Sequence, residues 1–422
     1  MGSRSTLREQ VIGLLVALYL LTGRWSPARV FDLEPSLLYE PRVWSVVGLA
    51  LLAMLPRPTL RRPVPPVRGA LGAVAWPLVY LGFALLSVAW APDLDKAPDN
   101  ATNAALMLVT LASLHRLCGS VDPHALSTAI WRALTGLLVA MALIAIVGGG
   151  SSSRLAILGG GPNVFGRNMG LLCAIALFYA IRSGGSGWPS AIGSTVAAAL
   201  VVLSGSRGGM VATAAALASL LVMGRQGLSR RLFALGVFVC LGLLVVGYTE
   251  FGASVVERFN ARVLRLLFEE GYVSNRDRIF VTAIDLGGRS PLVGHGLGSF
   301  AVLTPWPYAH NMFLDAFAET GLLGLLLLTG AITQGGLMLL RNRHRQVAPA
   351  AAAFVLYFMS AQFSGGLYDS RGVYVFLLLA AVLEPRAFAF IHTTGHTTGH
   401  TTGHTTGHTT GHTTGHTTER AR

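Results

Sequence analysis

Long apolar runs separated by short polar loops dominate the pattern along the chain. A run of roughly 17–25 apolar residues is long enough to cross a lipid bilayer as a helix. We predict about twelve such spans, at residues 8–23, 42–56, 69–91, 101–117, 125–148, 164–182, 188–204, 208–224, 231–250, 311–340, 347–364 and 371–390. The pattern therefore predicts an all-α, polytopic integral membrane protein.

The composition supports this interpretation. Hydrophobic residues make up 52% of the 422 residues and charged residues only 12%, which is about half the charged fraction of soluble domains. A soluble enzyme and a disordered regulator are therefore unfavourable interpretations. The three cysteines, Cys118, Cys173 and Cys240, are far apart and provide neither a disulfide framework nor a C-x-x-C motif.

The net charge of +13 comes almost entirely from arginine, and these arginines punctuate the apolar runs instead of forming a stripe. That pattern favours membrane topology or an anionic lipid substrate over nucleic acid. Arginine collects in cytoplasmic loops, and its distribution agrees with the alternation of spans when both termini are cytoplasmic. Residues 1–390 then form the membrane domain.

One long polar segment, residues 251–310, interrupts the apolar pattern on the outer side. Helical spacing of apolar residues predicts a helix along the membrane surface at 254–270 and a second short helix at 276–287. We interpret the segment as a helical loop or lid over the membrane domain. The tail, residues 391–422, is dominated by a His-Thr-Thr-Gly repeat that cannot bury a core and should be disordered.

Several arginines lie on the outer side, against the topology bias. Arg207 lies in the tight Ser204–Gly209 link between two spans, where it either reaches lipid phosphate or lines an anion-binding cavity. Arg265, Arg276 and Arg278 belong to the 251–310 segment, where salt bridges with neighbouring carboxylates are the alternative. Several forked guanidinium groups facing one cavity would suit a diphosphate.

His310 stands at the start of the 311–340 span, on the same side as these arginines. Its intrinsic pKa suits removal of a proton from a hydroxyl near neutral pH. Asn311 is expected to orient the histidine or to cap the helix. Glu319 lies within the span, where it needs a partner, and we expect an arginine. Asp93 and Asp95 form a D-x-D pair, which is either a metal site or, as we favour, a solvated acidic loop.

Five motifs occur in order: Pro162-Asn163, Ser204-Gly205-Ser206-Arg207-Gly208, the Arg276 segment, Pro291–Phe300, and H-N-x-x-L-x4-E-x-G-x-x-G from His310 to Gly324. Together they resemble the bacterial O-antigen ligase family, which also includes O-antigen polymerases and protein O-oligosaccharyltransferases. The resemblance covers roughly residues 160–330 by motif and the whole chain by number of spans. Phe280 and His295 depart from the residues usual at their positions.

The resemblance implies a GT-C-like glycosyltransferase of the bacterial inner membrane, with its active site on the periplasmic face. It would transfer O-antigen polysaccharide from undecaprenyl diphosphate to a sugar hydroxyl of lipid A–core, with inversion and without a metal or cofactor. Arg207 and Arg276 would bind the diphosphate and His310 would act as general base; Asn163 belongs to the supporting set. Polymerase or protein transferase activity, and less so transport of an anionic lipid, are the alternatives.

Overall fold

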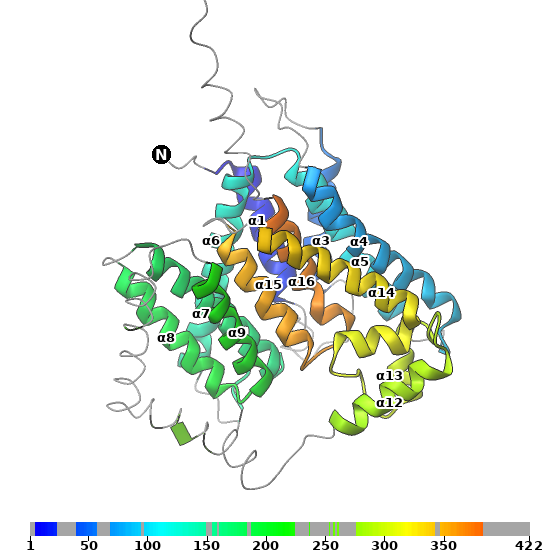
Figure 1. The fold of residues 1–422 in the computed structure, drawn as a ribbon. Coiled ribbons are helices and arrows are strands. Elements are labelled where there is room, and N and C mark those ends of the chain that lie inside the picture. The colour runs from blue at the N-terminus through cyan, green and yellow to red at the C-terminus, as the bar shows by residue number, and fades with distance from the viewer. Residues whose placement is uncertain are drawn as a thin grey trace, which may run out of the picture. The chain divides into compact units, whose positions relative to one another are not determined.

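The computed structural model describes residues 5–22, 39–56, 68–93, 97–148, 154–157, 160–183, 187–223, 276–341 and 347–382, together with residues 236, 253, 256, 257 and 260. Helices joined by short links account for most of these residues, and no β-strand occurs among them (Figure 1). The prediction of an all-α chain is confirmed for this part of the sequence.

The helices are α1 (Leu7–Leu21), α3 (Pro41–Met54), α4 (Arg68–Leu86), α5 (Ala97–Cys118), α6 (Pro123–Val147), α7 (Pro162–Ser183), α8 (Trp188–Leu203), α9 (Arg207–Met223), α12 (Arg276–Arg289), α13 (Ser299–Leu303), α14 (Met312–Arg341), α15 (Ala348–Ala361) and α16 (Arg371–Val382), with short 3-10 turns η2 (Ser87–Trp90) and η5 (Leu367–Ser370). Each predicted span except 231–250 coincides with one of these helices. That span lies outside the described residues apart from Gly236, as do Arg265, most of 254–270 and the tail. The predicted short helix at 276–287 is confirmed as α12.

Three of the described helices, α6, α7 and Met312–Leu340 of α14, are long and apolar enough to cross a membrane. Shorter apolar helices occur at Pro41–Met54, Val74–Trp90, Trp188–Leu203, Arg207–Met223 and Ala348–Ala361. These helices are those of a membrane protein in length and composition. The number of twelve spans and the GT-C-like arrangement stay predictions.

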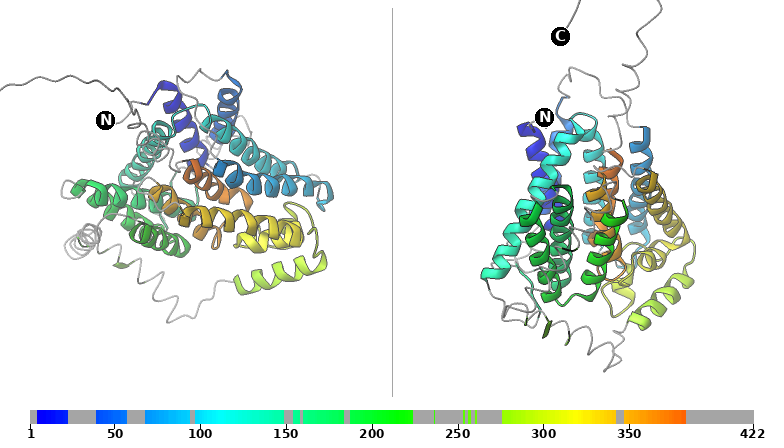
Figure 2. Two further views of the ribbon diagram at one scale, coloured as in Figure 1. Left: turned by 45° about the horizontal axis from the view of Figure 1, so that its top comes forward. Right: turned by 60° about the vertical axis from the view of Figure 1, so that its left-hand side comes forward.

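Helix α7 is the most enclosed of the three long apolar helices. It packs against α8, α9 and α15, and nearly all of its residues are buried (Figures 1 and 2). Helix α16 packs against α15 and α4, and its residues 373–381 are buried as well. A helix surrounded by other helices can carry a polar residue away from lipid, which matters for the site described below.

Helix ends that the arginine distribution assigns to the outer side lie together. Arg371, the first residue of α16, is buried and donates hydrogen bonds to the carbonyl oxygens of Tyr19 (3.0 Å) and Leu20 (2.7 Å) at the end of α1. Arg42, at the start of α3, donates to Asn103 Oδ1 near the start of α5 (2.8 Å). The guanidinium groups thereby satisfy carbonyl and amide oxygens that helix ends leave without partners.

The opposite helix ends meet in the same way. Arg8, near the start of α1, donates to the Leu52 carbonyl oxygen in the last turn of α3 (3.2 Å). Arg116, in the last turn of α5, donates to the Ala53 carbonyl oxygen of α3 (2.5 Å). Both sets of contacts agree with the predicted alternation of spans, whereas the side of the membrane that each set faces stays a prediction.

Helix α14 is broken at Gly321, whose φ of 66° and ψ of −164° are outside the helical region. The break frees carbonyl groups at the end of the first half of the helix. The Ala318 carbonyl oxygen accepts from the His295 N–H (3.2 Å) and the Glu319 carbonyl oxygen from the Gly296 N–H (2.8 Å). A loop from the preceding segment therefore replaces the missing helical hydrogen bonds.

The second half of α14 is completed by the same loop. The N–H groups of Leu322 and Leu323 donate to the carbonyl oxygens of Pro291 (2.7 Å) and Leu292 (3.1 Å). A Cβ atom on Gly294 would collide with the Glu319 backbone, and Gly294 has a φ of 68°. The glycine-rich motifs recognised in the sequence are thus the two sides of one broken-helix junction.

Candidate functional site

A polar cavity of about 400 Å³ opens where the first turns of α7, α9 and α12 meet the segment that follows α15. Four arginines line it, namely Arg154, Arg167, Arg207 and Arg276, with Asp369 as the carboxylate among the described lining residues. We call it the arginine cavity. Its lining charge is strongly positive, so its ligand should be an anion.

Helix starts add to this positive potential. The N-terminal turn of a helix presents N–H groups without helical partners and carries a partial positive charge. Arg207 is the first residue of α9, and the cap is Ser206, whose Oγ accepts from the Gly209 N–H (3.1 Å). Gly208 has no room for a side chain because Phe363 packs against it. The serines and glycines of this motif therefore bring the α9 backbone to the wall of the cavity.

Arg276 comes from the first residue of α12 and reaches the end of α15. Its Nη2 donates to the Phe363 carbonyl oxygen (3.0 Å), and its guanidinium carbon lies 5.7 Å from the centre of the Phe363 ring. Burial lowers the pKa of Arg276, and so does the positive charge of Arg207. Two like charges thus act on each other across the cavity, which a bound anion would relieve.

Two further polar side chains fix the opposite wall. Arg154 Nη2 donates to Asn163 Oδ1 (3.2 Å) and to the Gly205 carbonyl oxygen (3.3 Å). Asn163 Nδ2 in turn donates to Ser364 Oγ (3.2 Å). These bonds tie the start of α7 to the α8–α9 link and to the segment after α15. Asn163 therefore lies in the wall of the cavity and links these segments; its place in the supporting set stays a prediction.

Arg167 is buried on α7, with 5% of its surface exposed. Its Nη1 donates to the Asp369 carbonyl oxygen (3.1 Å), its Nη2 lies 3.7 Å from Asp369 Oδ1, and it packs on the Tyr357 ring at 5.0 Å. Asp369 is paired with Arg167, and the described lining contains four arginines for this one carboxylate, so the cavity has an excess of positive charge.

His310 lies near the start of α14. Among the described residues, it is the non-glycine residue with a positive φ, which is 58°. Its Nδ1 lies 3.2 Å from the Phe363 carbonyl oxygen, and its ring meets the Tyr308 ring edge-on at 4.5 Å. A carbonyl oxygen only accepts hydrogen bonds, so Nδ1 carries the proton in the neutral ring. The Nε2 lone pair is then free to take a proton.

The electrostatic surroundings keep this imidazole neutral. Burial lowers the pKa of His310 and the nearby Arg276 lowers it further, while the bond to the Phe363 carbonyl oxygen acts in the opposite direction. A group whose pKa falls below its ordinary value of about 6.5 is unprotonated at neutral pH. His310 is thus in the protonation state that a general base requires.

The Phe363 carbonyl oxygen connects His310 with Arg276. It follows the end of α15, so no helical N–H occupies it, and it accepts from both Arg276 and His310. The arginine and the histidine therefore lie at one point although they are distant in the sequence. A backbone acceptor carries no sequence signal, and this part of the site was not predicted.

Residues 191–329 match the family model described as O-antigen ligase. This region is similar to the O-antigen ligase family. No curated protein matches the chain. The family includes glycan ligases and polymerases of the glycosyltransferase type, which supports an enzyme with that kind of function, and the apolar helices support a membrane protein.

The matched O-antigen ligase region contains Arg207, Arg276 and His310 but only part of the cavity. Arg154 and Arg167 come from outside it, and the sequence analysis missed both. Each offered a signal: Arg154 lies in a loop expected on the outer side, and Arg167 lies inside a predicted span, where an ionisable residue is a functional candidate by default.

The remaining predicted residues are placed as follows. Asn311 caps α14, since its Oδ1 accepts from the N–H groups of Phe313 (3.0 Å) and Leu314 (3.2 Å). Arg278 is exposed, two residues after Arg276. Asp93 is the last residue before a gap in the described chain, and Asp95 lies within that gap.

Glu319 is half-buried on α14, and its carboxylate accepts hydrogen bonds from the backbone N–H groups of Gly298 and Phe300. The sequence analysis expected an arginine as the partner of Glu319. Its partners are instead backbone N–H groups of the glycine-rich loop, which is the Pro291–Phe300 motif. Glu319 therefore fixes the loop against the broken helix, which is a structural contribution to the site.

Proposed function

We propose that the protein transfers O-antigen polysaccharide from undecaprenyl diphosphate to a sugar hydroxyl of lipid A–core, at the periplasmic face of the inner membrane. The observation that carries this proposal is the Phe363 carbonyl oxygen, which bonds Arg276 of the positive cavity and the neutral imidazole of His310 at once. An anion site and a base at one point are what glycan transfer from a diphosphate needs.

The arginine cavity binds the diphosphate. Guanidinium groups match pairs of phosphate oxygens in a bidentate manner, and the starts of α7, α9 and α12 add backbone N–H donors. Arg207 and Arg276 supply the guanidinium groups that would contact the diphosphate. As the glycosidic bond breaks, negative charge grows on the departing diphosphate, so these groups stabilise the transition state more than the ground state.

His310 activates the acceptor. Its Nε2 takes the proton of the attacking hydroxyl while the hydroxyl oxygen forms a bond to the anomeric carbon of the donor. The bond between that carbon and the diphosphate oxygen breaks, and its electron pair leaves with undecaprenyl diphosphate. Direct attack from the face opposite the leaving group inverts the anomeric centre.

The arginines do the electrostatic work that a metal ion performs in other glycosyltransferases. Transfer should therefore proceed at an undiminished rate in the presence of a chelator. A rate that chelation abolishes and a divalent cation restores would favour the alternative in which Asp93 and Asp95 hold a metal.

The test of the function is reconstitution of the purified protein with a lipid-linked glycan and three acceptors offered separately: lipid A–core, a second lipid-linked glycan, and a serine- or threonine-containing peptide. We expect glycan on lipid A–core. Product on the second lipid-linked glycan alone would instead indicate a polymerase, and product on the peptide a protein glycosyltransferase. Movement of the lipid across the bilayer without transfer would indicate a transporter.

A further inference from the structure

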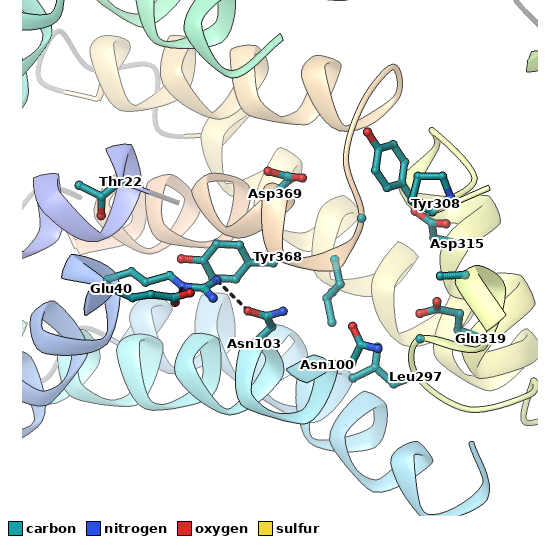
Figure 3. A pocket seen from close by; sticks show the side chains of 16 residues that line it. Thr22, Glu40, Asn100, Asn103, Leu297, Tyr308, Asp315, Glu319, Tyr368 and Asp369 are labelled. Carbon is teal, nitrogen blue, oxygen red and sulfur yellow. Dashed lines mark hydrogen bonds and ion pairs between the residues drawn. The ribbon is translucent and has the colours of Figure 1, made fainter. Parts of the chain in front are cut away.

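A second cavity, of about 290 Å³, shares Tyr308 and Asp369 with the arginine cavity. Its lining includes four acidic and two asparagine side chains, and we call it the acidic cavity. Figure 3 shows Asp315, Glu319 and Asn100 at one end, and Glu40, Asn103 and Tyr368 towards the other. It lies between the start of α5, the glycine-rich loop, α14 and η5.

Asp315 contributes a buried carboxylate oxygen that lacks a hydrogen-bond donor among the described residues. The residue is 7% exposed, and its Oδ1 accepts from the Ala309 N–H (2.6 Å). Its Oδ2, although buried, has no hydrogen-bond partner within the part of the chain that the structure describes. A buried carboxylate oxygen without a donor is unfavourable by roughly 1–3 kcal/mol or more, so a ligand that donates a hydrogen bond is expected there.

The cation of this cavity is already engaged. Arg42 donates to Asn103 Oδ1 (2.8 Å), forms an ion pair with Glu40, and stacks on the Tyr368 ring at 4.5 Å. With Arg42 balanced by Glu40, the described lining of this cavity has no excess of positive charge. A diphosphate would therefore not be attracted to this cavity.

The lining chemistry suits a polyol. A sugar ring carries several hydroxyl groups, each of which donates to a carboxylate and accepts from an amide or hydroxyl group. No three His, Cys, Asp or Glu side chains gather closely enough to hold a metal ion among the described residues. We propose that the acidic cavity binds a sugar ring of a substrate, with Asp315 Oδ2 accepting a hydrogen bond from one of its hydroxyl groups.

The location fits the transfer reaction, and this inference rests on the proposed function in that respect. Tyr308 lines both cavities and its ring contacts His310. A sugar in the acidic cavity and a diphosphate in the arginine cavity would flank Tyr308 and Asp369, with the base beside them. The sugar belongs either to the acceptor or to the first residue of the donor glycan, and the two are separable by experiment.

The test is the isosteric Asp315→Asn variant, in which Oδ1 can still accept from the Ala309 N–H and an NH2 donor group replaces Oδ2. The KM for lipid A–core and the KM for the lipid-linked donor are measured separately, with binding of undecaprenyl diphosphate as the measure of an intact arginine cavity. Asp285→Asn, the same change on the exposed face of α12, is the matched control.

We expect diphosphate binding to be retained and the KM for lipid A–core to rise at least about 10-fold, because the hydrogen bond between the sugar hydroxyl group and Asp315 Oδ2 is lost. A rise confined to the donor KM would identify the donor sugar as the occupant. Unchanged KM values for both substrates, with diphosphate binding retained, would overturn the sugar site. If Asp315→Asn also loses diphosphate binding, Asp315 has a structural role and the sugar site is overturned.

Failure of the proposed function would be distinct. The wild-type protein would then transfer no glycan to any acceptor, and the cavity would be tested by binding alone. In that test, free core oligosaccharide should bind the wild-type protein and the Asp285→Asn variant but bind the Asp315→Asn variant at least about 10-fold more weakly. Equal binding to all three would overturn the inference.

Discussion

The two cavities share Tyr308 and Asp369 yet have opposite chemistry. The arginine cavity combines three arginines in excess over its carboxylate with the starts of three helices. The acidic cavity contains carboxylates and amides, and its one arginine, Arg42, is held by Glu40 and stacked on an aromatic ring. The two cavities therefore differ in their balance of charged side chains although they are adjacent.

Under the proposed function, this difference lets one site orient two substrates that both carry sugars. The diphosphate would be attracted to the arginine cavity and not to the acidic cavity, so the leaving group would have a single favourable place. The hydroxyl groups of a sugar are neutral and satisfy the carboxylates of the second cavity without competing for the arginines. Each prediction below changes one cavity, or their junction, and leaves the other as it is.

The largest effect is expected at the junction. His310→Ala removes the base while both cavities keep their lining, so the rate of transfer should fall by roughly 10²–10⁴-fold with binding of undecaprenyl diphosphate retained. Single-turnover transfer assays measure the first quantity and ligand binding the second. Transfer near the wild-type rate in this variant would remove His310 from the role of base.

A smaller effect is expected from the arginine cavity. Arg276→Lys keeps the charge but loses the planar fork, so transfer should fall by about 10–100-fold, as expected for a lost charge-assisted hydrogen bond. Arg289→Lys, at the exposed end of the same helix, is the matched control and should transfer at the wild-type rate. Equal rates in both variants would indicate that Arg276 only stabilises the end of α15.

A third prediction concerns the break in α14, whose first half carries Asp315 and Glu319 of the acidic cavity. Gly321→Ala forces a side chain into a positive-φ position against Leu292, and the free energy of unfolding should fall by about 1–3 kcal/mol. Thermal unfolding in detergent measures this change. Gly336→Ala, in the second half of α14 with open space around it, should leave stability unchanged or raise it by up to about 1 kcal/mol. Equal melting temperatures in the two variants would contradict the account of the break.

The smallest effect concerns pH. Because burial and Arg276 lower the pKa of His310, transfer should stay constant from pH 8 to 7 and decline only below about 6.5, as the imidazole becomes protonated. Replacing Arg276 with glutamine removes one cause of the lowered pKa, so the acidic decline should move to higher pH. A decline centred above pH 7 in the wild-type protein would contradict the assignment of the neutral base.

The sequence predicted the helices well because apolar runs between polar links determine where a membrane helix can form. It also named Arg207 and Arg276, since arginines on the outer side violate the usual bias of a membrane protein. His310 was named from its position at a helix start and its motif, and Asn163 from its motif alone. The structure brings these residues to one place.

What the sequence did not reveal depends on tertiary contacts. The Phe363 carbonyl is a backbone group, free only because α15 ends before it. Arg154 reaches the cavity through its bonds to Asn163 and Gly205, which come together only when α7 packs beside the α8–α9 link. The acidic cavity needs α5, α14 and η5 to meet, and no spacing within a single helix indicates that.

The most direct test of the account is a structure of the protein with undecaprenyl diphosphate bound. The account predicts phosphate oxygens within hydrogen-bonding distance of Arg207 and Arg276, at the starts of α9 and α12, and no phosphate beside Asp315. A diphosphate held in the acidic cavity, or away from both arginines, would contradict it.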